Sequence, residues 1–311
     1  MEDLGKTQKD YAFYLPAISS FYVKQLDKLQ NEGAPRVPEG LELGHEGMDF
    51  LKDKDTYYYY PWGLYSAGHA QLDLEKLDPD AMITNRDRSK TMILGDSGGF
   101  QIATGVIKMD WANAINPNDP EREKLVDKIL KWEEEQCDWA MTLDVPPFAA
   151  FPPFNKKTGL ETFEQTMTIS LYNLDYYMKN RTPGKCKFLN VMSGVDQPTC
   201  DEWYEKVKHF SDPKFCQEAY GNSELALEGY AFADLQKRNM RMALRRILKL
   251  REDGLLKDKG WIHFLGTGKL DWACYLTSIQ RMLRKHDSPE ICLSMDAASP
   301  FVNSAYGSTY T

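Results

Sequence analysis

The chain has 311 residues, of which 42% are hydrophobic and 27% are charged, so it can form one large core and shows no compositional sign of disorder. Its opening stretch is charged, and no apolar run approaches the roughly 18 residues of a membrane span. We therefore expect no signal peptide, no membrane anchor and a cytoplasmic location. The net charge of −8 disfavours a protein that coats nucleic acid by bulk attraction, but it leaves room for a local basic patch.

Six cysteines are scattered along the chain: Cys137, Cys186, Cys200, Cys216, Cys274 and Cys292. They form no CxxC pair and have no histidine at zinc-finger spacing, which argues against both a disulfide framework and a structural zinc ion. We expect reduced, mostly buried thiols, and we expect neither a metal ion nor a cofactor.

From about Thr91 onward, short apolar or β-branched runs alternate with longer amphipathic segments, a pattern typical of repeated βα units. The candidate strands there are Met92 to Gly95, Asp138 to Leu143, Lys187 to Met192, Leu225 to Gly229, Trp261 to Leu265 and Glu290 to Met295. Helical patterns lie between them, at Glu121 to Gln136, Leu160 to Lys179, Cys200 to Phe210, Leu235 to Glu252 and Asp271 to Lys285.

Two earlier runs, Tyr11 to Ile18 and either Thr56 to Leu64 or Ala81 to Thr84, bring the strand count to eight. Eight strands in a chain of this length favour an α/β fold of the closed (β/α)8 type, a TIM barrel, over an open sheet. We expect one domain over residues 1–311, with an irregular insertion at about 30–60 that is rich in Gly, Glu, Asp and Tyr.

The end of the chain departs from the repeat. Only about fifteen residues follow the last candidate strand, too few for a full eighth helix. We therefore expect the outer ring of helices to be incomplete, or to be closed by the helical pattern near Phe21 to Leu29. A truncated chain would look the same.

The most distinctive motif is DSGGFQ, from Asp96 to Gln101, which directly follows a candidate strand. In an eight-stranded βα barrel, reactive groups lie on the loops at the C-terminal ends of the strands. Two glycines there allow a sharp turn and a close approach to a flat ligand, while Asp96 and Ser97 supply an acid and a donor. An ordinary turn before a helix N-cap explains these residues equally well.

Two further aspartates fall at candidate strand ends. Asp144, in LDVPP, could accept hydrogen bonds from the edge of a purine or could simply cap a turn. Asp296 lies in SMDAASP, at the end of the final strand. Asp96 and Asp296 could be the paired carboxylates of a double displacement at a sugar carbon, although spacing alone does not show that they face each other.

Two glycine-bearing runs complete the expected mouth of the barrel: LEGYAF at Leu227 to Phe232 and FLGTGK at Phe264 to Lys269. The GTGK run lacks the length and the following Ser or Thr of a Walker motif, so we do not expect it to bind a nucleoside triphosphate. A close approach of the backbone to a planar base is the functional interpretation, and simple turn glycines are the alternative.

Taken in order, DSGGFQ, LDVPP, VMSG at Val191 to Gly194, LEGYAF, FLGTGK and the last-strand aspartate closely resemble the guanine transglycosylases, the family of the queuine and archaeosine tRNA-ribosyltransferases. The resemblance covers roughly Met92 to Pro300. In that family the last-strand aspartate attacks C1′ of the target nucleoside, expels guanine and holds a covalent sugar intermediate until a 7-deazaguanine replaces it. The resemblance thus implies a pentosyltransferase, and its target base must leave the nucleic-acid stack to reach a barrel mouth.

By position, the resemblance implies that Asp296 is the nucleophile and that Asp96 is the general acid/base for the departing and entering bases. Asp144 matches the carboxylate that reads the purine edge, and Phe100 and Leu265 match the side chains that sandwich the base. The other base-binding positions it implies are Ser97, Gly98, Gly99, Gly194, Gly229, Tyr230 and Gly266. These roles are chemically coherent, because a carboxylate nucleophile needs no deprotonation near pH 7 and a leaving purine needs a proton donor.

Three departures separate the chain from the tRNA-modifying members. No cysteine follows Cys292, so the family's C-terminal zinc subdomain is lacking; Ala297 to Pro300 replaces a Pro-Thr-Arg run; and Met192 and Ser193 replace a base-binding glutamine turn. These losses resemble the branch that inserts 7-deazaguanines into phage or bacterial DNA. We therefore expect DNA and a free base such as 7-cyano-7-deazaguanine as partners, in a bacterial host cytoplasm if the protein is phage-encoded.

A basic stripe supports nucleic-acid binding in general. Arg238, Arg241, Arg245 and Lys249 recur at helical spacing, opposite the apolar residues Met240, Leu244, Ile247 and Leu248. We interpret the stripe as a contact for the nucleic-acid backbone. A solvated helix face is the common alternative.

Three alternatives stay open. A tRNA-guanine transglycosylase would use the same chemistry, with tRNA in place of DNA. A non-catalytic partner subunit of such an enzyme is a second, although the presence of both Asp96 and Asp296 argues against it. An unrelated barrel acting on a small metabolite is the third, and DSGGFQ argues against that one. The sequence predicts no particular oligomeric state.

Overall fold

The computed structural model describes residues 10–32, 39–76 and 80–308. Eight parallel strands form one sheet in the order β1-β8-β7-β6-β5-β4-β3-β2. The strands are β1 Phe13–Pro16, β2 Trp62–Ser66, β3 Met92–Asp96, β4 Trp139–Met141, β5 Lys187–Met192, β6 Gly229–Phe232, β7 Trp261–Phe264 and β8 Cys292–Ala297. A parallel bridge between Ala17 and Leu64, with a 2.8 Å hydrogen bond from Ile18 N to Leu64 O, links β1 to β2 and nearly closes the barrel. The expected (β/α)8 fold is confirmed.

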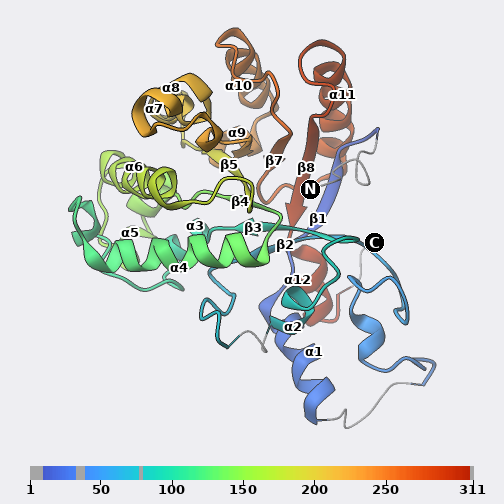
Figure 1. The fold of residues 1–311 in the computed structure, drawn as a ribbon. Helices are drawn as coiled ribbons and strands as arrows, with labels where there is room; N and C mark the ends of the chain where they lie inside the picture. Colours follow the sequence, from blue (N-terminus) through green and yellow to red (C-terminus); the bar gives the residue numbers. More distant parts are fainter. Residues whose placement is uncertain (1–9, 33–38, 77–79, 309–311) are drawn as a thin grey trace.

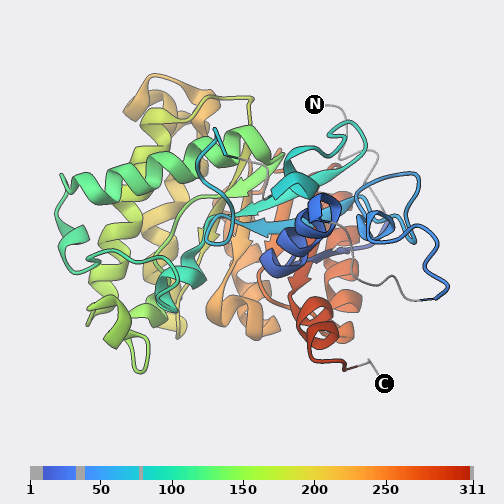
Figure 2. The same cartoon turned by 90° about the horizontal axis from the view of Figure 1, so that it is seen from below.

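Helices surround the strands, as Figure 1 and the perpendicular view in Figure 2 show. They are α1 Ser20–Glu32, α2 Ala81–Thr84, α3 Gly99–Ala103, α4 Pro120–Gln136, α5 Asn155–Thr158, α6 Phe163–Asn180, α7 Gln197–Val207, α8 Pro213–Tyr220, α9 Asp234–Arg238, α10 Met240–Glu252, α11 Leu270–His286 and α12 Ser299–Ala305. Short 3-10 turns are η1 Glu46–Met48, η3 Asn113–Ile115, η4 Pro147–Ala150, η5 Lys208–Ser211 and η6 Ser223–Leu225.

Polar side chains fix where several helices begin. Thr162 and Gln165 form a capping box at the start of α6, and Asp196 and Thr199 form one at α7. The predicted helix over Leu235 to Glu252 is in fact two helices, α9 and α10. The break falls at Asn239, whose side chain accepts hydrogen bonds from the first backbone N–H groups of α10.

The strands bury both faces, as parallel strands in a barrel must. One set of alternate residues fills the barrel interior, and the other packs against the helices. Aromatic rings form the floor of the interior. The ring centre of Phe13 lies 5.4 Å from the ring centres of both Trp62 and Trp261, and the ring centres of Trp261 and Trp139 lie 5.2 Å apart. This floor is at the N-terminal ends of the strands, so the open mouth lies at their C-terminal ends.

Two strand predictions need correction. The first candidate for the second strand, Thr56 to Leu64, overlaps β2 only at its end, because β2 runs from Trp62 to Ser66; the other candidate, Ala81 to Thr84, is helix α2. The sixth strand was placed four residues too early: Gly229 begins β6 and does not end it. The Gly229 backbone passes so close to its neighbour that a Cβ there would lie 2.4 Å from the carbonyl oxygen of Trp261, which explains the glycine structurally.

The described part of the expected insertion is irregular, and the helix after the last strand is short, as expected. Helix α1 runs to Glu32, and the described residues 39–60 hold only the turn η1 as regular structure. After β8, the seven-residue helix α12 packs beside α1, with the rings of Tyr22 and Phe301 5.1 Å apart. The eighth helix is therefore short, and α1 lies next to it.

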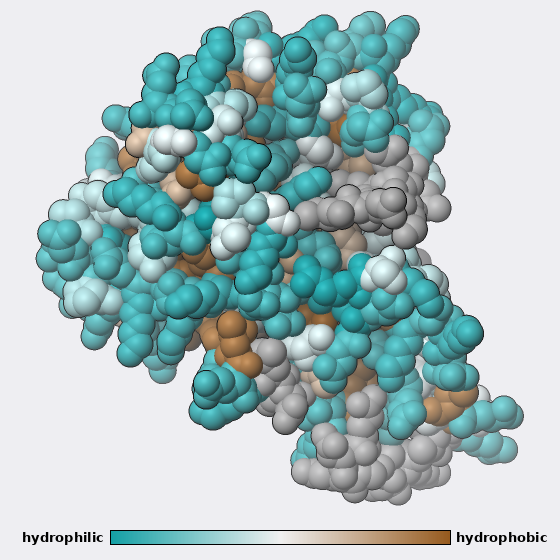
Figure 3. Space-filling view, in the orientation of Figure 1, coloured by the Kyte–Doolittle hydropathy of each residue, from teal (hydrophilic) through white to brown (hydrophobic). Residues whose placement is uncertain are grey.

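None of the helices in residues 10–32, 39–76 and 80–308 has the length and apolar composition needed to cross a membrane. The face of the molecule in Figure 3 is mainly hydrophilic, with apolar side chains showing only in small separate patches. All six cysteines are free, and Cys274 alone among them is exposed.

Candidate active site at the barrel mouth

A cavity of about 510 Å³ opens at the C-terminal ends of the strands. Its volume falls within the roughly 300–1,000 Å³ typical of small-molecule sites. Eight of the residues expected from the sequence line it: Asp96, Ser97, Gly99, Phe100, Asp144, Leu265, Gly266 and Asp296. They come from the ends of β3, β4, β7 and β8, so the barrel brings together side chains separated by up to 200 positions, from 96 to 296.

The DSGG turn between β3 and α3 has little room for side chains. Gly98 has a φ of +98°, a conformation that side chains rarely adopt. At Gly99, a Cβ would lie 2.8 Å from Oδ1 of Asp144 and 3.0 Å from its carbonyl oxygen. Ser97 is buried, and its hydroxyl donates to the carbonyl oxygen of Thr142 at 3.3 Å. The serine thus ties β3 to the residues after β4, and the second glycine lets the turn approach Asp144.

Asp96 ends β3 and lines the cavity. Burial raises the pKa of its carboxyl, and the negative charge of Asp296 raises it further. Hydrogen bonds from Ser66 and from Gly98 N act in the opposite direction, as does nearby His69. Asp96 and Asp296 both line this cavity. A raised pKa favours a carboxyl group that can carry a proton and give it up.

Asp144 follows β4 and lines the same cavity. Burial, together with the charges of Asp234 and Asp96, raises the pKa of Asp144 to about 8. Below that pH Asp144 is therefore a neutral carboxylic acid, which can donate a hydrogen bond as well as accept one. Donors on an incoming ligand would favour the ionised form instead.

Asp296 lies near the end of β8, and only 6% of its surface is exposed. Its Oδ1 accepts a hydrogen bond from Gly266 N at 2.5 Å and lies 3.1 Å from Nε2 of His263. Within the described part of the chain, no hydrogen bond reaches Oδ2. One carboxylate oxygen is thus held by the protein, and the other is free for a reacting partner.

Apolar side chains form the walls of the cavity. Phe100 is 60% exposed at its rim, and its ring centre lies 6.3 Å from that of Phe148, which also lines the cavity. Leu265 lines the cavity from the end of β7. Flat apolar surfaces beside polar groups suit a planar heterocycle with hydrogen-bonding edges.

Three titratable residues at the cavity were not identified from the sequence: Asp234, Lys237 and His69. Asp234 follows β6 with a φ of +47°, and its Oδ2 accepts a 2.8 Å hydrogen bond from Ser193. Burial lowers the pKa of Lys237, while the charges of Asp234 and Asp296 oppose that shift. Asp234 carries the same signal that marked Asp144, an aspartate directly after a strand, but the misplaced β6 concealed it.

Four expected base-binding residues are not part of the cavity lining: Gly98, within the DSGG turn, and Gly194, Gly229 and Tyr230. Tyr230 is fully buried and donates from its hydroxyl to Leu255 O at 2.7 Å, on the outer side of the barrel wall. Gly229 begins β6, at the barrel floor. Gly194 packs against Cys200 in the loop after β5 and accepts from Leu235 N, next to Asp234. The positions that β6 offers to the mouth are Ala233 and Asp234 instead.

The basic stripe is divided between α9 and α10. Arg245 pairs with Asp201 at 2.8 Å, and Lys249 pairs with Asp253 at 2.9 Å, so both charges are partly neutralised. Arg238 and Arg241 are exposed. The predicted apolar face was wrong in part, since Leu244 is 40% exposed and Leu248 54% exposed; α10 packs instead through Met242, Ala243, Arg246, Ile247 and Leu250.

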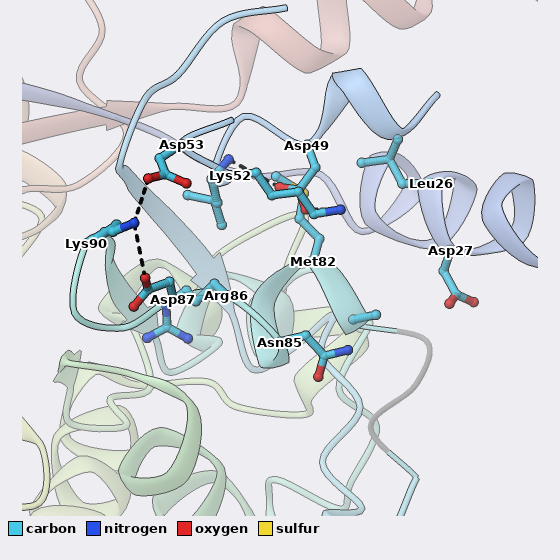
Figure 4. A pocket seen from close by; sticks show the side chains of 12 residues that line it. Leu26, Asp27, Asp49, Lys52, Asp53, Met82, Asn85, Arg86, Asp87 and Lys90 are labelled. Atoms are coloured by element: carbon cyan, nitrogen blue, oxygen red, sulfur yellow. Dashed lines mark hydrogen bonds and ion pairs between the residues drawn. The ribbon is translucent and has the colours of Figure 1, made fainter. Parts of the chain in front are cut away.

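Two other cavities lie outside the mouth. One, under α1 and α2, is lined by charged residues that pair with one another: Lys90 bridges Asp53 and Asp87, and Lys52 pairs with Asp49 (Figure 4). The other is an apolar groove between α1 and α12, and it adjoins the mouth through Ser19 and Val302. In the first of these cavities Asp49, Asp53 and Asp87 are paired with lysines, whereas four aspartates, Asp96, Asp144, Asp234 and Asp296, line the mouth.

No protein-family model, curated protein or solved structure matches this chain. In the described residues, no group of three or more His, Cys, Asp or Glu side chains is arranged to hold a metal ion.

Proposed function

We propose that this protein is a DNA-guanine transglycosylase, which exchanges guanine in DNA for a 7-deazaguanine such as 7-cyano-7-deazaguanine. The observation that carries the proposal is the convergence of Asp96, Asp144 and Asp296 on one cavity of about 510 Å³. Phe100 and Leu265 line the same space, where they would cover the faces of a bound base.

In the first half of the proposed reaction, Oδ2 of Asp296 attacks C1′ of the target nucleotide. The C1′–N9 bond breaks and its electron pair leaves with guanine, which takes a proton from Asp96. The product is a covalent ester between Asp296 and the sugar. The raised pKa of Asp96 supports this role, because the group must hold a proton before the bond breaks.

In the second half, N9 of the incoming 7-deazaguanine attacks C1′ and gives its proton to Asp96. The C1′–Oδ2 bond breaks, and its electron pair returns to Asp296. Both carboxyl groups are then restored, so no cofactor is consumed. Two displacements at the same carbon retain the sugar's configuration.

Asp144 is proposed to read the edge of the base. Ionised, it would accept hydrogen bonds from the N1–H and the exocyclic amino group that guanine and 7-deazaguanines share. An adenine presents no such pair of donors. The carboxyl of Asp144 lies beside Gly99 of the DSGG turn, on the same side of the cavity as Asp96.

The test is an exchange assay with radiolabelled guanine and the purified protein, run separately on DNA and on tRNA. We expect label in DNA, loss of that label when 7-cyano-7-deazaguanine is added in excess, and no incorporation by Asp296→Asn. Label in tRNA alone would replace DNA by tRNA as the substrate. Label in neither pool would contradict the proposal, and would favour a partner subunit or an unrelated barrel.

A further inference from the structure

A line of four polar groups runs up the barrel interior from the aromatic floor to the mouth. Trp261 and His263 alternate on β7, and Ser294 and Asp296 alternate on β8, so all four point into the barrel. Nε1 of Trp261 donates to Oγ of Ser294 at 2.7 Å, and the same oxygen lies 2.7 Å from Nδ1 of His263. The other nitrogen of His263, Nε2, lies 3.1 Å from Oδ1 of Asp296.

The hydrogens in this line can be assigned from what each group is able to donate. A tryptophan N–H only donates, so Ser294 accepts from Trp261 and has one hydrogen left. If that hydrogen goes to Nδ1 of His263, the histidine carries its own hydrogen on Nε2 and donates it to Asp296. The reverse tautomer would set the bare Nε2 lone pair against a carboxylate oxygen. The forward assignment gives each of the four groups a hydrogen-bond partner.

We propose that His263 is a positioning residue for Asp296, oriented in turn by Ser294 and Trp261. His263 Nε2–H and Gly266 N–H both bind Oδ1, so Oδ2 is the oxygen presented to the cavity. His263 has no exposed surface, so it acts through Asp296 and not on the substrate. The inference deepens the proposed function and rests on it for the role of Asp296.

The arrangement also bears on the second displacement. Once Oδ2 is bonded to C1′, Oδ1 becomes the carbonyl oxygen of the ester. The two N–H groups that hold Oδ1 then draw electron density from the ester and help the C1′–Oδ2 bond to break. Loss of the His263 donor should therefore slow both formation and breakdown of the covalent intermediate.

The kinetic test compares His263→Leu with His263→Gln, because a glutamine amide can donate from nearly the same position as Nε2. We expect His263→Leu to slow single-turnover adduct formation by about tenfold to a hundredfold, the loss that follows removal of one hydrogen bond to a charged group, with oligonucleotide affinity unchanged. His263→Gln should recover most of that loss. A leucine variant that reacts as fast as the wild type would overturn the inference and leave the proposed function standing.

The second test needs no substrate and does not depend on a folded leucine variant. The chain has five histidines, so the 15N spectrum of its imidazoles can be assigned by comparison with His263→Gln. We expect His263 to carry its hydrogen on Nε2, with Nδ1 accepting from Ser294, and to lose that single tautomer in Ser294→Ala. A hydrogen on Nδ1 in the wild type would overturn the inference. This result can hold even if the exchange assay finds no activity.

Discussion

Of the four aspartates that line the mouth, Asp96, Asp144 and Asp296 differ in their surroundings, and these differences determine what each can do. Asp296 is held at one oxygen by two donors, Asp96 is coupled to the charge of Asp296, and Asp144 has a pKa raised to about 8. When several carboxyl groups line one cavity, ionising all of them is unfavourable because their negative charges repel. Their pKa values therefore differ, and some hold a proton at a pH where others are ionised. The proposed division into nucleophile, proton carrier and base reader uses that separation.

Asp144 supplies a pH prediction. If a guanine-type base binds to the ionised carboxylate, the affinity must fall as pH drops below the raised pKa of about 8, because binding then requires release of a proton. We expect the dissociation constant to rise by up to about tenfold for each pH unit below that value. Calorimetric titration with free guanine, in buffers of different ionisation enthalpy, measures both the affinity and the proton released.

The control for that titration is Asp144→Asn, which cannot change its charge. It should bind the base more weakly near pH 8, and its remaining affinity should vary little with pH across the same range. Wild-type affinity that is independent of pH between about pH 6 and about pH 8 would show that Asp144 does not read the base in its ionised form.

Sequence reasoning identified residues well where a motif and a strand end coincided, and failed where the strand itself was misplaced. DSGGFQ follows a run of apolar residues whose end is unambiguous, so Asp96 was placed correctly at the mouth. In LEGYAF the glycine suggested a strand end, yet Gly229 begins β6 because of close contact with Trp261. His263 was missed because a buried histidine on a strand has no distinguishing local pattern; only its partners on β8 reveal a role.

The turn between β3 and α3 depends on the absence of a side chain at Gly99. Gly99→Ala would place a Cβ 2.8 Å from Oδ1 of Asp144, so the carboxyl or the turn must move. We expect a loss of about 1–3 kcal/mol in the free energy of unfolding, the usual effect of overpacking, and a base affinity at least about tenfold weaker. Thermal denaturation and base titration measure the two effects.

Gly221→Ala is the matched control, because Gly221 has a φ of +74° at the end of α8 and no atom lies within 4 Å of the added Cβ. It should reduce stability through backbone strain alone and leave base affinity unchanged. Equal base affinity in Gly99→Ala and the wild type would mean that the turn does not position Asp144 for binding.

The helices α9 and α10 carry a prediction about nucleic acid. Arg238 and Arg241 lie near the mouth end of the stripe and are exposed, whereas Lys249 is paired with Asp253 further along α10. Replacing either arginine by alanine should weaken DNA binding and reduce the salt slope of the affinity by about one, as expected for one phosphate contact. Lys249→Ala should change neither quantity. Fluorescence anisotropy over a range of salt concentrations distinguishes these outcomes, and an unchanged slope in both arginine variants would remove the stripe from the interface.

At the scale of the whole molecule, the fold was predictable because its signal is repeated. Short apolar runs separated by amphipathic helices recur along most of the chain, and an error at one strand leaves the pattern intact. The breaks in the repeat were harder: Ala81–Thr84 has the composition of a short strand but forms α2, and Asn239 divides one expected helix into two through its side-chain cap. Neither helix α2 nor the break at Asn239 follows from the spacing of apolar residues, so the sequence pattern did not predict either of them.

The barrel also explains why Asp96 and Asp296 could be paired only in three dimensions. Asp96 ends β3 and Asp296 is the last residue but one of β8. These strands are not neighbours in the sheet, and closure of the sheet turns both strand ends toward one mouth. The sequence motifs identified Asp96 and Asp296 as candidates, and only the closed barrel shows that they line the same cavity.

The most direct measurement is to react the protein with guanine-containing DNA, quench with denaturant, digest, and locate any covalently attached nucleotide by mass spectrometry. We predict one adduct, on the peptide that contains Asp296, absent in Asp296→Asn. An adduct on another residue, or exchange that proceeds undiminished in Asp296→Asn, would contradict the assignment of Asp296 as the nucleophile.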